Sequence, residues 1–405
     1  MNKNKYFLLL ILISFSIFLS GCWDKKEVTD IAIVAAIAID KNEEGRYLGT
    51  YQFFIPGNIA NSLQGGGGGQ SPPVSVYSAT GDTFLEISGK ISEKISREPY
   101  YSHANLLIFS EELAREEGIA SFLDAFDRGN QFRTTTRIII ARDTLASNML
   151  KILTTIENVP AEKIMKNIIS TQEHWGESVD VNLSDVINQL ITEGIDPLIS
   201  GFTVKGNPEE GKKQENLQET NQSTIIEADG LAIFKNGKLI DWLSSESARG
   251  AVWTLNKIKN TTMAVDWEQK KQVISFQVVR QKTRINVDNR NGKPHITVNV
   301  RAEGEISEIK TPIDLKDPDI LNDMENVIEK EIKKEIEKAI HQGQKHKADI
   351  FGFGDTIHRT DLKLWKTVRK DWESVIFPNL DVEVKVDTFI RGTELRNNSF
   401  LSEIK

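Results

Sequence analysis

Residues 31–39 read IAIVAAIAI, an unbroken apolar run that is too short for a membrane-spanning helix. A polar turn follows at residues 40–45 (DKNEEG), and residues 47–55 (YLGTYQFFI) then have the composition of a strand. Short apolar runs that are bounded by turn residues are typical of buried strands. We therefore predict a buried β-hairpin at the start of the folded chain.

Beyond this hairpin, the pattern changes repeatedly between helical and strand periodicity. Apolar residues three or four positions apart predict helices, while short apolar runs and a period of two predict strands. The expected helices are residues 82–96, 111–127, several between 144 and 193, 245–258 and 317–342, and the expected strands are 104–109, 137–141, 225–234, 238–243, several between 274 and 300, and 380–390. We interpret the Lys/Glu face of the helix at 317–342 as solvated. The predicted fold class is α+β (mixed α/β), with mixed and antiparallel sheets and packed helices.

The chain length of 405 residues allows two or three domains. We predict three: an N-terminal mixed α/β domain (22–145), a middle helical and β-hairpin domain (146–262), and a C-terminal α+β domain with an antiparallel meander (263–395). Residues 206–224 contain no large apolar residue except Leu217, and we interpret them as a polar surface insertion in the middle domain. Asn236-Gly237 between two strands predicts a type I′ hairpin turn.

Composition excludes some classes of protein. With 39% hydrophobic and 27% charged residues, the chain is globular and neither disordered nor collagen-like. Its 50 Lys and Arg against 58 Asp and Glu give a net charge of −8, and no basic stripe is visible in the sequence. Nucleic-acid binding needs clustered cations that neutralise phosphates, so we predict no nucleic-acid partner.

The amino terminus predicts export and attachment to a membrane. Lys3 and Lys5 precede a 13-residue run, residues 7–19 (FLLLILISFSIFL), which has the form of a signal peptide; we place that peptide at residues 1–21. Leu19-Ser20-Gly21-Cys22 follows, and Cys22 is the only cysteine of the chain. This segment resembles a bacterial lipobox, in which the cysteine becomes an S-diacylglycerol cysteine that is also N-acylated after cleavage. The alternative is an ordinary signal peptide beside an incidental thiol.

A lipid-modified Cys22 would anchor the chain without spanning the bilayer. Each methylene buried in the bilayer contributes about 0.8 kcal/mol to membrane binding. One acyl chain gives only marginal binding, whereas two long acyl chains give stable attachment. The expected partner at this end is therefore membrane lipid, through the acyl chains.

The sequence contains no pattern that requires catalysis. His341 and His346 are five residues apart, whereas a helical metal-ligand pair needs a spacing of four, and Gly-x-Ser-x-Gly is absent. We therefore predict no enzymatic activity, no metal site and no cofactor. Two segments are rich in Gly, Arg and aromatic residues, residues 127–137 (DRGNQFRTTTR) and 351–359 (FGFGDTIHR). For both we favour internal ion pairs and caps over direct contacts with a ligand or partner.

Taken in order, several short motifs resemble the Ger(x)C lipoproteins, the C subunits of nutrient germinant receptors in endospore-forming bacteria. The motifs are Gly21-Cys22-Trp23-Asp24 with Glu27, Ser102-His103, residues 131–137 (QFRTTTR), residues 229–234 (DGLAIF), Gly250 with Trp253, Gly352-Phe353-Gly354, His358-Arg359 and Trp365-Lys366. The resemblance runs nearly from end to end.

The resemblance implies a lipoprotein on the outer face of the spore inner membrane that works with two membrane-embedded partners, an A and a B subunit. It also implies three mixed domains, no catalytic activity, and Cys22 as the lipid-modified residue. We expect the chain to act as a scaffold and coupling component in nutrient-triggered germination. The alternatives are a solute-binding lipoprotein that captures a small nutrient directly, and a cell-wall hydrolase with an acid/base pair in a cleft.

Overall fold

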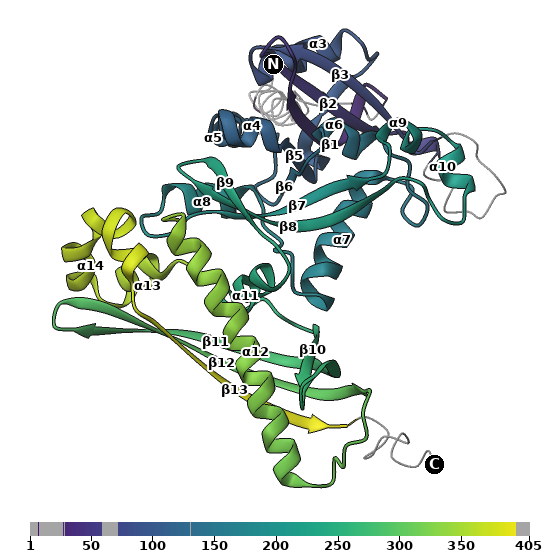
Figure 1. Ribbon diagram of the computed structural model, residues 1–405. Helices are drawn as coiled ribbons and strands as arrows, with labels where there is room; N and C mark the ends of the chain where they lie inside the picture. The colour runs from purple at the N-terminus through teal and green to yellow at the C-terminus, as the bar shows by residue number, and fades with distance from the viewer. Residues whose placement is uncertain (1–6, 8–26, 28, 59–71, 130, 394–405) are drawn as a thin grey trace.

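The computed structural model describes residues 7, 27, 29–58, 72–129 and 131–393. The predicted hairpin is present: β1 (Ile31–Lys41) pairs antiparallel with β2 (Tyr47–Phe54). β1 lies inside a nine-stranded mixed sheet in the upper half of Figure 1. The other strands, in their order across this sheet, are β3 (Val74–Gly81) beyond β2, and then β5 (Leu106–Ser110), β6 (Arg137–Ala141), β7 (Leu198–Lys205), β8 (Ile225–Lys235) and β9 (Lys238–Leu243), with β4 (Glu98–Tyr100) beside β1.

Both faces of this sheet are buried, which explains the unbroken apolar run of β1. Ala36 and Ala38 face one helical layer, while Ile37 and Ile39 face the other. The first layer contains α6 (Ala146–Lys151) and α7 (Pro160–His174), and the second contains α3 (Phe84–Ser92), α4 (Glu111–Glu116), α5 (Ala120–Arg128) and α8 (Leu183–Ile191). Successive side chains of a strand point to opposite faces, so a strand covered on both sides is apolar throughout.

A second, four-stranded sheet begins after α11 (Glu246–Thr254) and occupies the lower half of Figure 1. β10 (Thr262–Trp267), β11 (Lys270–Arg290) and β12 (Lys293–Ile309) form the predicted antiparallel meander. β13 (Val382–Gly392) then joins β12 in parallel, after a long crossover through α12 (Pro318–Lys345), α13 (Phe353–Thr360) and α14 (Leu362–Val368). The fold class is therefore the predicted α+β, with mixed and antiparallel sheets and packed helices.

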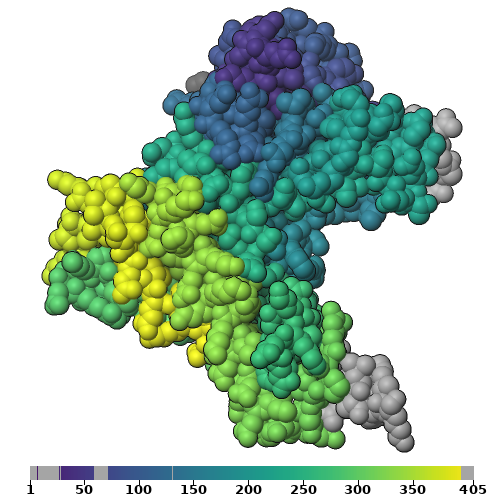
Figure 2. All heavy atoms as spheres, viewed as in Figure 1, coloured from purple at the N-terminus to yellow at the C-terminus, as the bar shows by residue number. Residues whose placement is uncertain are grey.

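We call residues 31–254 the N-terminal unit and residues 262–392 the C-terminal unit. The predicted division at residue 145 falls between β6 and β7, which pair with each other in one continuous sheet. The three-domain division stays a prediction. Figure 2 shows the two units in contact across the middle of the molecule, and one apolar core includes residues from both.

Residues 206–224 are more ordered than their composition predicts. They form two one-turn helices, α9 (Pro208–Gly211) and α10 (Glu215–Gln218). Asn216 is buried, and its side-chain amide donates to the carbonyl oxygens of Leu153 (3.2 Å) and Thr224 (3.1 Å). Hydrogen bonds of this buried amide, together with those of Gln222 and Thr224, therefore order a segment that has almost no apolar residue to bury.

Candidate functional site

Cys22, the residue that we predict to carry lipid, lies outside the described residues together with nearly all of the predicted signal peptide. Its lipidation stays a prediction. Within the described residues, none of the helices combines the length and apolar composition needed to cross a bilayer.

The first of the two predicted segments, residues 127–137, makes contacts inside the N-terminal unit. Arg137 forms a two-pronged ion pair with Asp180, at 2.7 and 2.9 Å. The Thr136 hydroxyl donates to the carbonyl oxygen of Ala104 at 2.8 Å, and the Phe132 ring packs against Phe126. The Arg137–Asp180 pair confirms the internal ion pairs predicted for this segment.

The second segment, residues 351–359, lies where the two units meet. Just before it, the buried Asp349 accepts hydrogen bonds from the backbone N–H groups of Phe353 (3.1 Å) and Gly354 (2.8 Å) and from the indole N–H of Trp372 (3.1 Å). Burial raises the pKa of Asp349 from 3.8 to about 7, although these donors favour the charged form. The carboxyl group thereby fixes the tight turn before α13.

The same turn is tied to the N-terminal unit. Asp196 accepts a hydrogen bond from the backbone N–H of Asp349 (2.9 Å), and its own N–H donates to the Asp349 carbonyl (2.9 Å). Lys235, at the end of β8, pairs with Asp196 (3.0 Å) and with Glu373 of the C-terminal unit (2.8 Å). Within segment 351–359 itself, the backbone N–H of Asp355 donates to the carbonyl oxygen of Gly194 at 3.1 Å. The segment therefore takes part in a contact between units, which the prediction of internal ion pairs and caps did not include.

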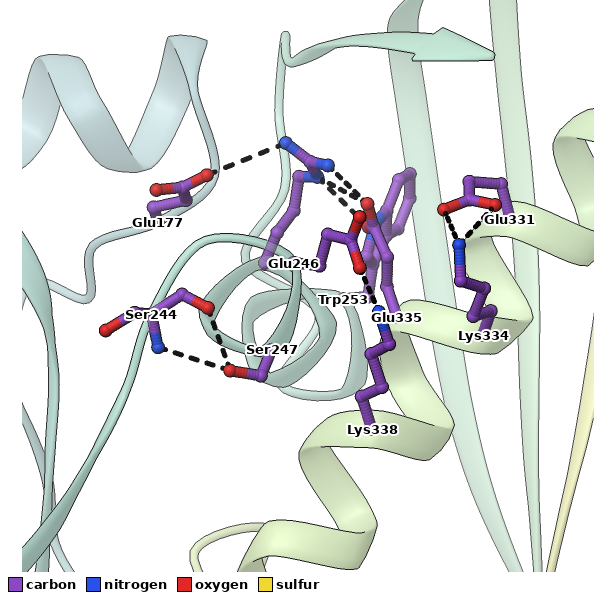
Figure 3. Close-up of polar contacts among 10 residues, drawn as sticks. Glu177, Ser244, Glu246, Ser247, Trp253, Glu331, Lys334, Glu335 and Lys338 are labelled. Carbon is purple, nitrogen blue, oxygen red and sulfur yellow. Dashed lines mark hydrogen bonds and ion pairs between the residues drawn. The ribbon is translucent and has the colours of Figure 1, made fainter. Parts of the chain in front are cut away.

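A buried ion pair forms the centre of the contact between units. The Arg249 Nε on α11 lies 3.0 Å from both carboxylate oxygens of Glu335 on α12, and the Trp253 indole N–H donates to the same carboxylate at 3.2 Å. Glu177 lies 3.7 Å from the other side of the guanidinium. Figure 3 shows Glu335 beside Trp253, and Glu177, a residue of the N-terminal unit, on the other side of the guanidinium.

Glu335 corrects one expectation from the sequence. The Lys/Glu face of the helix at 317–342 is expected to be solvated, yet the Glu335 side chain is 0% exposed. Burial raises the pKa of Glu335, although Arg249 and Trp253 both favour its charged form. A buried carboxylate stays charged only with such partners, so the pair holds α11 and α12 in one relative position.

Two glycines bring backbones of the two units into direct contact. A Cβ on Gly250 would lie 2.0 Å from the carbonyl oxygen of Glu335, and a Cβ on Gly194 would lie 2.6 Å from the carbonyl carbon of Gly354. No side chain fits at either position without a backbone shift. We call these contacts, together with the Arg249–Glu335 pair and the Asp196–Asp349 hydrogen bonds, the junction.

The junction offers polar and charged groups. No group of three or more histidine or carboxylate side chains in the described part of the chain is placed to hold a metal ion. The sequence motifs include Gly250, Trp253 and Gly352-Phe353-Gly354, which the structure brings to the junction. They do not include Glu335, Asp196 and Lys235, because single charged residues carry no sequence signal of burial.

Comparisons with known proteins cover almost the whole chain. The family model "Spore germination protein N-terminal domain" matches residues 24–204, and "Spore germination B3/ GerAC like, C-terminal" matches residues 229–394. Spore germination protein KC of Bacillus subtilis is 41% identical over 403 residues, which cover 99% of each chain. Spore germination protein B3 of the same organism is 24% identical, over 92% of this chain and 94% of its own.

A solved structure has the same fold. The crystal structure of the GerBC protein aligns with a TM-score of 0.56 and 20% sequence identity, over 88% of this chain and 97% of the other. Two family models that together match most of the chain, and a relative that is 41% identical along its whole length, agree with the motifs quoted above. The chain belongs to the Ger(x)C family of spore germination proteins.

Proposed function

We propose that this chain is the lipid-anchored C subunit of a nutrient germinant receptor, on the outer face of the spore inner membrane. There it serves as a non-catalytic scaffold and coupling component beside an A and a B membrane subunit. The observation that carries the proposal is the similarity to Spore germination protein KC, which extends over 99% of both chains.

The junction supports a coupling role. Side chains and backbones of the two units meet in a buried contact that includes Arg249–Glu335 and Gly194–Gly354. A displacement of one unit is therefore passed to the other, because buried ion pairs and close-packed backbones do not deform continuously. A chain built in this way suits a protein that relays a mechanical change between partners.

The predicted anchor places the N-terminal unit near the bilayer. Ile31, at the start of β1, is nine positions after Cys22. A fully extended chain spans at most about 3.5 Å per residue, so β1 begins within roughly 30 Å of the acylated residue. Confinement beside the membrane subunits raises their effective concentration, so that modest protein contacts suffice for assembly.

Substitution of the anchor residue tests the proposal. Cys22→Ala should release the protein from spore membranes and abolish nutrient-triggered germination, whereas Ser20→Ala, which keeps a small residue before the cysteine, should leave both unchanged. Mass spectrometry of the amino-terminal peptide should show diacylglycerol and N-acyl groups on Cys22. Full germination with a detached Cys22→Ala protein would refute the anchoring argument.

One observation favours the solute-binding alternative enough to test it. A cavity of about 400 Å³ lies beside the junction, with apolar residues Leu123, Ile187 and Leu190 and the carboxylate of Asp196 in its wall. Cavities of roughly this size hold small ligands in many proteins. Calorimetry of the full chain with amino acids and sugars should show no heat of binding if the coupling role is correct, and saturable binding would favour direct nutrient capture.

A further inference from the structure

The sheet of the C-terminal unit has one face that no described element covers. α12 packs on the other face, where Val298, Val300 and Ala302 of β12 are at most 1% exposed. In Figure 1, α12 crosses in front of β11, β12 and β13. Side chains at the alternate positions of these strands point away from α12, and we call the surface that they form the open face.

Three cations of β11 stand in a row on the open face. Arg280, Lys282 and Arg284 are exposed and occupy alternate positions. A bulge between Val278 and Arg280 shifts the alternation, so that these three residues point away from the helix. None of them has an ion pair or side-chain hydrogen bond to any described residue. Same-side residues of a strand are about 7 Å apart, so the row extends over about 13 Å.

The neighbouring strands complete a basic groove. Arg301 of β12 and Arg391 of β13 share the buried carboxylate of Glu303, which lies 3.0 Å from Arg301 Nε. The Arg301 guanidinium also lies over the Phe389 ring, 4.4 Å from its centroid. The groove has a volume of about 800 Å³, and Asp387 is its other carboxylate. With five cations and two carboxylates, the groove is positively charged, although the whole chain has a net charge of −8.

We propose that this groove binds an extended acidic segment of a partner protein. In an extended chain, carboxylates at alternate positions have the same spacing of about 7 Å as Arg280, Lys282 and Arg284. One segment can thus satisfy all three cations at once. Phe389 offers an apolar surface in the same region, and its ring is 41% exposed.

The arrangement fits a peptide better than a small anion or a lipid surface. The three cations lie in a row and do not converge on one point, so a single phosphate could not contact all of them. Asp387, which is exposed, would repel a dense anionic surface, whereas a backbone N–H group of a peptide can donate to it. This inference goes beyond the proposed function, because it does not depend on the anchor at Cys22.

The test uses the full chain in neutral detergent and a fluorescent peptide, acetyl-Ser-Glu-Ser-Glu-Ser-Glu-Ser-amide. We expect saturable binding that weakens as salt rises from about 50 mM to about 200 mM, and no binding of the matched Gln peptide. Lys282→Glu with Arg284→Glu should weaken binding by at least roughly tenfold. Lys282→Gln with Arg284→Gln should give a smaller loss.

The matched control is Arg290→Glu with Lys293→Glu, which reverses the same charge at the exposed tip of the same hairpin. It should leave binding unchanged, and circular dichroism should show all variants folded. Equal losses in the two double variants, no peptide binding, or binding only to vesicles that contain phosphatidylglycerol would each overturn the proposal. The last result would assign the groove to lipid headgroups.

Discussion

Gly250 brings the backbones of the two units into direct contact, because a Cβ there would lie 2.0 Å from the Glu335 carbonyl oxygen. Gly250→Ala should therefore lower the free energy of unfolding by about 1–3 kcal/mol or more, as the helices are forced apart. Gly89→Ala is the matched control, since Gly89 lies in α3 and a Cβ there would meet no atom within 4 Å.

That control should stabilise the chain by about 0.5–1 kcal/mol, because Ala loses less backbone entropy than Gly in a helix. Urea unfolding followed by circular dichroism measures both changes. Equal effects at the two glycines would show that α11 and α12 can separate at little cost.

The Arg249–Glu335 pair should behave as a buried unit. Arg249→Ala leaves the Glu335 carboxylate without its main partner, so we expect a loss of about 3–5 kcal/mol in unfolding free energy. Replacing both residues by Met should recover much of this loss, because no charge then stays buried. Glu337→Ala is the control on the same helix: its ion pair with Lys333 is long, at 3.7 Å, and half exposed, so its loss should change stability by at most about 1 kcal/mol.

Asp349 should make stability depend on pH. Its pKa rises from 3.8 to about 7 on burial, so between these values the folded chain holds a proton that the unfolded chain has released. The contribution of Asp349 to stability therefore falls as pH increases from about 4 to about 7 and is constant above. The difference in unfolding free energy between the parent and Asp349→Asn, measured in urea at each pH, should decrease over this range. A difference that grows with pH would contradict the assignment.

Among single residues, the sequence motifs indicated Gly250 and Trp253, but neither Gly194 nor the charged residues that are buried. Glu335 is one of many Lys and Glu residues on its helix, and its spacing matches the solvated face as well as the buried one. Its burial follows from Arg249, which is 86 positions away along the chain. Pairing over such a distance depends on tertiary structure, which periodicity cannot supply.

Among the helices and strands, α12 protects the outer edge of β13. The Glu329 carboxylate accepts a hydrogen bond from the backbone N–H of Thr388 (2.9 Å), and Glu325 accepts one from Ile390 (2.8 Å). Unpaired edge groups are otherwise free to pair with another chain. Two side chains one helical turn apart thus cover two alternate N–H groups of the strand.

Replacing Glu325 and Glu329 by Ala should expose this edge. We expect faster hydrogen exchange at Thr388 and Ile390 and a loss of about 1 kcal/mol for each hydrogen bond. The control is Glu331→Ala with Glu337→Ala, since these residues pair with lysines of α12 itself. Exchange at β13 that is equally fast in both double variants would indicate a general loosening of the helix.

Local elements were largely predictable from the sequence. The strand at residues 137–141 has the predicted bounds, and Asn236-Gly237 forms the tight turn with positive φ at both positions. The apolar stripe of α12 is buried at Met324 and Ile328 as its spacing predicts. The order of the strands was not predictable, because parallel neighbours such as β5 and β6 are joined through helices and their pairing leaves no local pattern.

Across the full fold, one apolar core extends through both units. We therefore expect a single cooperative unfolding transition in urea. Amide protons of β5 and of β12 should lose their protection against hydrogen exchange at the same urea concentration. Gly250→Ala should separate the two midpoints, because it weakens the contact between units without touching either sheet. Two midpoints in the parent chain would mean that the units unfold independently.

The two glycine contacts of the junction have a geometric consequence. Gly250 touches α12 at Glu335, while Gly194 touches α13 at Gly354. The two contacts therefore hold two successive helices of the C-terminal unit, α12 and α13, against the N-terminal unit. Rotation of one unit about either contact would break the other, so neither contact can act as a hinge on its own.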